Sequence, residues 1–236
     1  MGCENGEWIM RGVSEDDPRC IKSADELIEY IEKVGFLPLF RNEISDFSVE
    51  ERTVAEHWWS GDKQRDPWEW RGEIARSGKV AYGKFFHRKA CYISLEWLPH
   101  FVNFRREGYD FDSRRDEGLA PHKHTRIMSC FEEADELYSN ELKAKAGAEK
   151  SFEQALSELQ MQTYLTVRDF RQRLNKKGQP YGWAIGVYAT PEALWGYDFV
   201  TSAYCEEPGE SLRKLTEHIK SLHPELTDKE IIKALK

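Results

Sequence analysis

Residues 66–106, DPWEWRGEIARSGKVAYGKFFHRKACYISLEWLPHFVNFRR, decide which fold the sequence predicts. The segment predicts a helix, a two-stranded hairpin and a second helix. Pro67 suits the first turn of a helix, where its missing N–H has no partner to lose. Gly78 suits the left-handed C-cap that would end that helix. Residues 80–94 are rich in Tyr, Phe, Ile and Val and contain no Pro, which favours strands.

The residues before this segment add two helix starts. Ser23 and Glu26 have the spacing of a capping box, and an apolar stripe follows them to Val34. Ser48 and Glu51 form a second such box, which predicts a helix through residue 59. The apolar connector GFLPLF, residues 35–40, is expected to be extended and buried. Helices followed by a basic hairpin are typical of a winged helix, here over residues 23–106.

The second half of the chain repeats this plan. Residues 126–139 and 151–160 have helical spacing, with a break expected near Gly147 in KAKAGAEK. Two strands are predicted between residues 161 and 190, joined by a turn that ends at Gly178. Residues 106–124 are predicted to be a loop, residues 199–204 a strand, and the remaining C-terminal residues helices. We therefore predict an α+β, mainly helical fold with a second helix-plus-hairpin lobe over residues 124–236, packed on the first as one compact unit.

Composition narrows the class of protein. No apolar run approaches the ~18 residues that span a bilayer, and the acidic N-terminus lacks the features of an export signal. The five cysteines are scattered without a CxxC pair, which predicts reduced thiols in a cytoplasmic protein. His122 and His124 offer two imidazoles but no visible further ligands, so a solvated loop is the simpler interpretation. We expect no metal, no cofactor, no membrane contact and a monomer.

Charge is distributed unevenly along the chain. The net charge is −8, and residues 1–60 alone carry 14 acidic and 6 basic side chains. Because exposed charges are screened over roughly 8–10 Å, a local cationic segment can still bind phosphate. Residues 79–106 and 168–177 are two such segments, one in each predicted hairpin region, and DNA is the partner they suggest. Their candidate nucleic-acid-binding residues are Lys84, Arg88, Lys89, Arg168, Arg171, Lys176 and Lys177.

Two groups of residues could take part in catalysis. Glu69 lies between Trp68 and Trp70, where desolvation would raise its pKa and suit proton transfer; alternatively it points outward and pairs with Arg65. The tryptophans themselves could stack on bases or simply fill the core. The sequence has no P-loop, no GxGxxG after a strand and no GxSxG elbow, which disfavours nucleotide hydrolysis, dinucleotide redox chemistry and esterase chemistry.

The second group is the pair Gln160 and Gln162. Two amides two residues apart project to the same side of an extended chain and could hold one water. A glutamine is no strong base, so the pair suits a leaving group that departs early, such as a cationic alkylated base. Surface amides that end a helix are the alternative interpretation.

Residues 157–170, SELQMQTYLTVRDF, resemble the QxQ segment of the AlkZ/YcaQ family of bacterial winged-helix DNA glycosylases. The stretches GFLPLF, DPWEWR, YGKFF and KACYIS resemble uncharacterised AlkZ-related bacterial proteins. The resemblance implies excision of alkylated bases, with Gln160 and Gln162 positioning the attacking water. In those glycosylases the motif lies near the N-terminus, whereas here it begins at residue 160.

Three functions therefore remain open. The first is a DNA-acting winged-helix protein that works as a DNA glycosylase-like enzyme and hydrolyses the N-glycosidic bonds of alkylated bases. The second is a non-catalytic DNA- or protein-binding regulatory module. The third is a small-molecule pocket between the lobes, lined by the tryptophans and Glu69.

Overall fold

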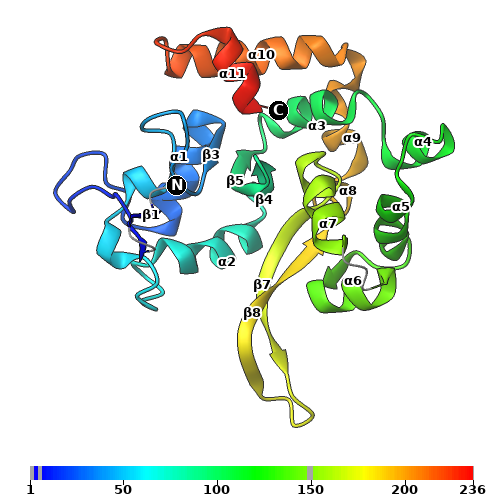
Figure 1. Ribbon diagram of the computed structural model, residues 1–236, viewed down its shortest axis with the longest axis horizontal. Coiled ribbons are helices and arrows are strands. Elements are labelled where there is room, and N and C mark those ends of the chain that lie inside the picture. Colours follow the sequence, from blue (N-terminus) through cyan, green and yellow to red (C-terminus); the bar gives the residue numbers. More distant parts are fainter. Residues whose placement is uncertain (1–2, 5–6, 148–150, 236) are drawn as a thin grey trace.

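The computed structural model describes residues 3–4, 7–147 and 151–235, and in these ranges the chain is α+β, as predicted (Figure 1). The first half contains β1 (Cys3–Glu4), β2 (Glu7–Trp8), α1 (Ala24–Val34), β3 (Phe36–Pro38), η1 (Glu50–Arg52), η2 (Ala55–His57), α2 (Pro67–Ser77), β4 (Val80–Phe86), β5 (Lys89–Ser94), α3 (Leu98–Arg106) and α4 (Phe111–Asp116). The second half contains α5 (His122–Met128), η3 (Ser129–Phe131), β6 (Glu136–Tyr138), α6 (Ser139–Ala146), α7 (Phe152–Met161), β7 (Thr166–Leu174), β8 (Pro180–Ala189), α8 (Pro191–Trp195), α9 (Tyr197–Val200), η4 (Ser202–Cys205), α10 (Pro208–Leu222) and α11 (Asp228–Leu235). No helix in the described ranges is long and apolar enough to cross a membrane.

One arrangement of helices and strands occurs twice. In residues 24–94, the first unit, α1 and β3 precede short helices, α2 and the antiparallel pair β4–β5, which we call the first ribbon; the sheet order is β3-β5-β4. In residues 122–189, the second unit, α5 and β6 precede α6, α7 and the antiparallel pair β7–β8, the second ribbon; the order is β6-β8-β7. In both units the early strand pairs with the second strand of the ribbon.

The helix ends follow the local signals in the sequence. Ser23 caps α1 by accepting from the N–H of Glu26, and Asp66 caps α2 by accepting from the N–H of Trp68 at 2.9 Å. Gly78 ends α2 with a φ of 67°, which a residue without Cβ adopts most easily. Gly147 follows α6, as expected; residues 148–150 of the same polar stretch lie outside the described residues.

Four local predictions were wrong. Residues 126–139, predicted to be helical, contain the end of α5 at Met128, then η3 and the strand β6. The capping box at Ser48 opens two short 3₁₀ helices instead of one α-helix, because Thr53 and Val54 are extended. Residues 106–124 contain α4 and the start of α5; the Asp110 carboxylate caps α4 by accepting from the N–H of Ser113 at 2.7 Å. Residues 199–204, predicted to be a strand, belong to α9 and η4, which begin after Gly196.

Two clusters of buried apolar side chains lie under the two units. The first joins α1, α2, α3 and the first ribbon; the second joins α5, α6 and α7. Tyr188 of the second ribbon packs against both. Leu215, Ile219 and Ile231 belong to the first cluster, so α10 and α11 return to the first unit although they follow the second in sequence. The division into lobes at residues 23–106 and 124–236 stays a prediction.

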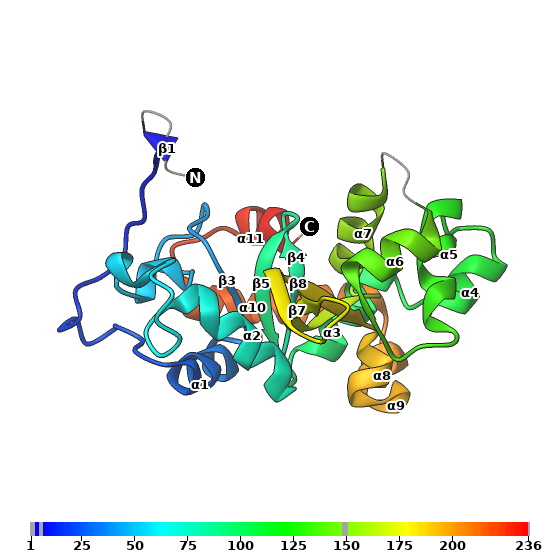
Figure 2. The same ribbon diagram turned by 90° about the horizontal axis from the view of Figure 1, so that it is seen from below.

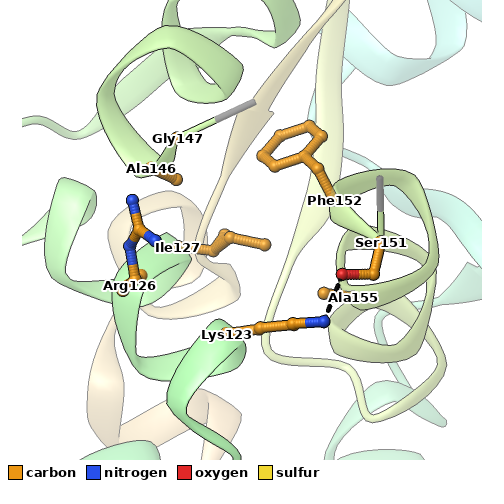
Figure 3. Close-up of a pocket in the computed structure, with 8 residues that line it drawn as sticks. All are labelled: Lys123, Arg126, Ile127, Ala146, Gly147, Ser151, Phe152 and Ala155. Carbon is orange, nitrogen blue, oxygen red and sulfur yellow. Dashed lines mark hydrogen bonds between the residues drawn. The ribbon is translucent and has the colours of Figure 1, made fainter. Parts of the chain in front are cut away.

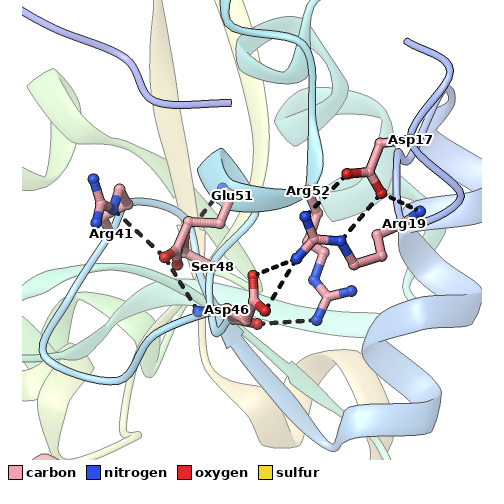
Figure 4. A network of polar contacts seen from close by, with 7 residues as sticks. All are labelled: Asp17, Arg19, Arg41, Asp46, Ser48, Glu51 and Arg52. Atoms are coloured by element: carbon pink, nitrogen blue, oxygen red, sulfur yellow. Dashed lines mark hydrogen bonds and ion pairs between the residues drawn. The ribbon is translucent and has the colours of Figure 1, made fainter. Parts of the chain in front are cut away.

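A polar network holds the segment before α1 against the loop after β3 (Figure 4). Arg19 bonds the carboxylates of both Asp17 and Asp46 at 2.9 Å, and Arg52 donates to the backbone carbonyl of Asp46. Ser48 donates to Glu51 at 2.7 Å in the same loop. Arg19 and Asp46 are solvent-exposed, whereas Ser48 is buried, so the ion pairs position the segment more than they stabilise the core.

Candidate nucleic-acid interface

The first ribbon lies against α7 of the second unit. The backbone N–H of Lys84 donates to Oε1 of Gln160 at 3.0 Å, and Nζ of Lys84 donates to Oγ of Ser157 at 3.2 Å. At the tip of the ribbon, Arg88 pairs with Glu158 at 3.3 Å and its N–H approaches Sδ of Met161. Lys84 and Arg88 are solvent-exposed, but their polar groups contact a helix of the same chain, which satisfies part of their charge and hydrogen-bonding capacity.

The reciprocal contact joins α2 to β7. Arg76 of α2 pairs with Asp169 of β7 at 2.8 Å. The Arg71 guanidinium lies 3.1 Å from the ring centre of Trp68 and 4.7 Å from that of Phe170. The long helix that precedes each ribbon therefore packs on the ribbon of the other unit, and neither α2 nor α7 is an isolated surface helix.

Carboxylates on β6 and β7 neutralise the two arginines predicted to bind phosphate. Nε of Arg168 bonds Glu136 at 2.8 Å, and Arg171 bonds both Glu136 and Asp169. The guanidinium of Arg171, with help from Arg168, holds the pKa of Glu136 below its usual value. Together with Arg76, three arginines share two carboxylates, which leaves a net charge of +1 in this network.

The tip of the second ribbon is different. Lys176 and Lys177 lie in the turn between β7 and β8 and form no ion pair with any residue that the structure describes. Asn175 fixes the turn by accepting from the N–H of Lys177 at 2.8 Å. On β8 the side chain of Trp183 is 90% exposed, and Tyr181 carries the Arg173 guanidinium 5.0 Å from its ring centre. Figure 1 shows this ribbon extending away from the rest of the molecule.

Sequence reasoning missed Trp183, although one signal was available. The strands of the second ribbon have 9 and 10 residues, against 7 and 6 in the first. A longer ribbon reaches beyond the helices that cover its base, so an aromatic residue close to its turn stays in solvent.

The structure separates the two glutamines. The extended chain assumed for Gln160 and Gln162 is wrong, since α7 runs to Met161 and residues two apart on a helix do not face each other. Gln160 is 1% exposed; besides accepting from Lys84, it donates Nε2–H to the carbonyl of Leu156 at 3.1 Å. Gln162 caps the end of α7, and its buried Oε1 has no hydrogen-bond partner among the described residues.

Glu69 and the tryptophans do not form a desolvated acid site. Glu69 is solvent-exposed on α2, so the expected burial between two indoles is wrong. Trp70 fills the first core and donates to the carbonyl of Gln64, whereas Trp58, Trp59 and Trp68 contact one another at ring distances of 5.8 and 6.1 Å. No hydrogen bond or ion pair in the described part of the chain joins Glu69 to Gln162.

His122 and His124 also have different surroundings. His122 is exposed at the start of α5, while His124 is buried and its Nε2 lies 3.1 Å from Glu158, the partner of Arg88. Burial lowers the pKa of His124, and the bond to Glu158 opposes that effect. The residues that the structure describes contain no group of three or more His, Cys, Asp or Glu that could hold a metal ion.

The described residues of the second half of the chain line a small hollow and a larger one. The one in Figure 3, between Lys123, Gly147 and Phe152, has a volume of about 10 Å³, enough for one water. The other measures about 280 Å³ and lies where α4, α5, α8 and α9 meet, with Tyr164 in its wall. Neither is lined by Glu69 or by a tryptophan.

Comparison with known proteins gives one match. A family model described as AlkZ related matches residues 21–236, which include both units and the C-terminal helices α10 and α11. Neither the curated proteins nor the solved structures contain a match. Since the family model covers nearly the whole chain, the protein belongs to the AlkZ-related family.

Proposed function

We propose that this protein acts on DNA and that the tip of the second ribbon is its main DNA contact. One observation carries the proposal: Lys176 and Lys177, without ion-pair partners in the described ranges, share a projecting ribbon with a tryptophan that is 90% exposed. Exposed aromatic side chains close to cationic ones are typical of proteins that stack on bases while they hold the backbone phosphates. Membership of the AlkZ-related family supports the same conclusion.

In this proposal each unit is a winged helix and each ribbon is a wing. The repeated order of helix, strand, helices and ribbon supports this assignment, as does the shared sheet order. The helix that reads DNA in such folds would be α2 in one unit and α7 in the other. Both pack on a neighbouring ribbon, so the second ribbon is the element best placed to reach a duplex.

The lysines would bind phosphates, and Trp183 would stack on a base or insert at a base step. Each phosphate neutralised by a lysine releases condensed counterions, which makes binding strongly salt-dependent. Stacking on an aromatic side chain contributes about 1–3 kcal/mol per base. The other residues predicted to bind DNA would act mainly by long-range attraction of its phosphates. They are Lys84, Arg88, Lys89, Arg168 and Arg171.

We further propose a glycosylase-like activity toward alkylated bases, with Gln162 as the group that holds the water. Its buried Oε1 has no partner among the residues that the structure describes and could accept a hydrogen bond from a water molecule. A weak acceptor suffices when the leaving base is already cationic, since that base departs as a neutral molecule. Gln160 would position α7 against the first ribbon, and Glu69 would act as an exposed carboxylate near the bound duplex.

The activity is tested with the purified full-length chain and duplexes that carry N3- or N7-alkylpurines. We expect abasic product above spontaneous loss, and we expect Gln162→Ala to abolish it while Gln154→Ala, an exposed amide on the same helix, does not. Absence of product from the unaltered chain removes the enzymatic claim. DNA binding that survives such a result supports the second candidate, a non-catalytic binding module, which the internal bonding of Gln160 favours.

A further inference from the structure

The last two residues of α3 bond the chain on both sides of Gln162 (Figure 2). Arg105 donates from a terminal guanidinium nitrogen to the carbonyl of Met161 at 2.6 Å, and Arg106 donates in the same way to the carbonyl of Thr163 at 2.7 Å. The end of a helix leaves its last carbonyls without intrahelical partners and carries a negative partial charge. Two neighbouring cations of α3 therefore hold the residues that precede and follow Gln162 at the end of α7.

The backbone of Gln162 is held as well. Its N–H donates to the carbonyl of Glu158 at 2.9 Å, and its carbonyl accepts from the hydroxyl of Thr163 at 2.5 Å. The N–H of Thr163 donates in turn to the carbonyl of Gln160 at 2.8 Å. By contrast, the buried Oε1 of Gln162 has no partner in the part of the chain that the structure describes. Hydrogen bonds thus fix the backbone around this residue and leave its side-chain oxygen open to a ligand.

Thr163 has a strained backbone. Its φ is 62°, in the left-handed region that residues with a side chain rarely adopt and β-branched residues least of all. The residue is also fully buried, so the strain is not relieved by contact with solvent. Strain of this kind persists only where surrounding contacts over-determine it, and it clusters at sites that need a preset geometry. The bond from Arg106 to the Thr163 carbonyl is one of the contacts that maintain it.

Arg105 is an unfavourable residue for a purely structural contact. It forms no ion pair with any residue that the structure describes, and its buried Nε has no hydrogen-bond partner there. Burial lowers the pKa of its guanidinium to about 10. A cation shielded from water without a carboxylate destabilises the folded state, and an apolar side chain would join α3 to α7 without this penalty. Arg106 differs, because Glu192 balances its charge.

We propose that Arg105 and Arg106 are positioning residues, which fix the direction in which the open amide oxygen of Gln162 points. They act through the carbonyls on either side of Gln162 and not through contact with the substrate. The inference rests on the proposed function, in which that oxygen holds the attacking water. A misplacement of about 1 Å at a reacting group can lower a rate about a hundredfold. Loosening this turn should therefore slow base release more than it weakens substrate binding.

The first experiment measures single-turnover release of N7-methylguanine from a duplex by the full-length chain, Arg105→Lys and Arg52→Lys. Arg52 is a matched control: its Nε is also buried without a partner in the described ranges, and its guanidinium donates to the carbonyl of Asp46 and lies over the ring of Tyr30. We expect Arg105→Lys to lower the maximal rate about tenfold at an unchanged half-saturating protein concentration, and Arg52→Lys to change neither. Equal maximal rates in the two variants, or a loss confined to the half-saturating concentration, overturn the proposal.

The second experiment needs no catalytic activity. In ¹H–¹⁵N spectra of the full-length chain, the side-chain amide of Gln162 is identified as the pair of signals that Gln162→Ala removes. We expect this pair to lie away from the shifts of free glutamine, to move toward them in Arg105→Lys and to stay in place in Arg52→Lys. A pair that already has the shifts of free glutamine in the unaltered chain, or that does not respond to Arg105→Lys, overturns the proposal.

The two experiments separate this inference from the proposed function. A response of the amide signals to Arg105→Lys, without abasic product from the unaltered chain, supports the positioning role and removes the glycosylase. Abasic product at equal rates from the unaltered chain and Arg105→Lys removes the positioning role and leaves the glycosylase intact.

Discussion

The two ribbons have similar compositions and different environments. Both are antiparallel, basic and aromatic, and both follow a helix of about three turns. The first ribbon is enclosed, with Phe85, Phe86 and Tyr92 in the core and its charged groups bonded to α7. The second is anchored only at its base and carries its aromatic and cationic residues into solvent. The difference teaches that strand length, and not residue type, separates an enclosed ribbon from a projecting one here.

The largest expected effect is a loss of stability, and it appears when one aromatic residue of each ribbon is replaced. Phe86→Ala empties a site that is 3% exposed and should lower the free energy of unfolding by about 3–5 kcal/mol. Trp183→Ala removes a side chain in solvent and should change it by less than about 0.5 kcal/mol. Urea unfolding followed by far-UV circular dichroism measures both; a large loss in Trp183→Ala would show that the second ribbon is also packed.

The second comparison concerns the two amides. Gln160→Ala removes a buried amide that accepts from the part-buried N–H of Lys84, and it should lower the free energy of unfolding by about 1–3 kcal/mol. Gln162→Ala removes an acceptor that has no partner in the described part of the chain, so its unfolding curve should match that of the unaltered protein. The same urea titrations measure both variants. Equal losses of unfolding free energy would show that both amides have structural roles.

A smaller effect is expected from pH. The folded state lowers the pKa of His124 below 6.5, so below that pH the unfolded chain binds a proton that the folded chain resists. The free energy of unfolding should therefore fall as the pH drops through about 6.5. His124→Gln should flatten this dependence between pH 7 and pH 5.5, as followed by thermal unfolding. If the stability of the variant still falls with pH as steeply as that of the unaltered protein, the dependence comes from other titratable groups.

Much of the fold could be predicted from the sequence because its signals are local. The caps at Ser23 and Asp66, the C-cap at Gly78 and the turn at Gly178 depend on neighbouring residues alone. One local signal, the helix cap at Asp110, was missed. The charged stretch after Arg106 was predicted to be a loop, yet α4 forms there because the Asp110 cap satisfies its first turn.

The candidate site was predictable only in part. Lys176 and Lys177 could be identified because a turn of Asn, Lys and Gly projects from any hairpin. The different environments of Gln160 and Gln162 could not, since they depend on which strand of another unit packs against α7. The larger hollow was likewise hidden, because its walls come from segments 87 residues apart that only the tertiary fold brings together, as the bond from Tyr197 to Asp110 shows.

The most direct test of the account measures DNA affinity as a function of salt for three forms of the protein. By fluorescence anisotropy, Lys176→Ala combined with Lys177→Ala should reduce the slope of log K against log salt by about 2, close to the 0.9 per phosphate expected for a duplex. Arg88→Ala, at the tip of the enclosed ribbon, should leave the slope unchanged. A slope that persists in the double lysine variant and falls in Arg88→Ala would contradict the assignment of the second ribbon as the DNA contact.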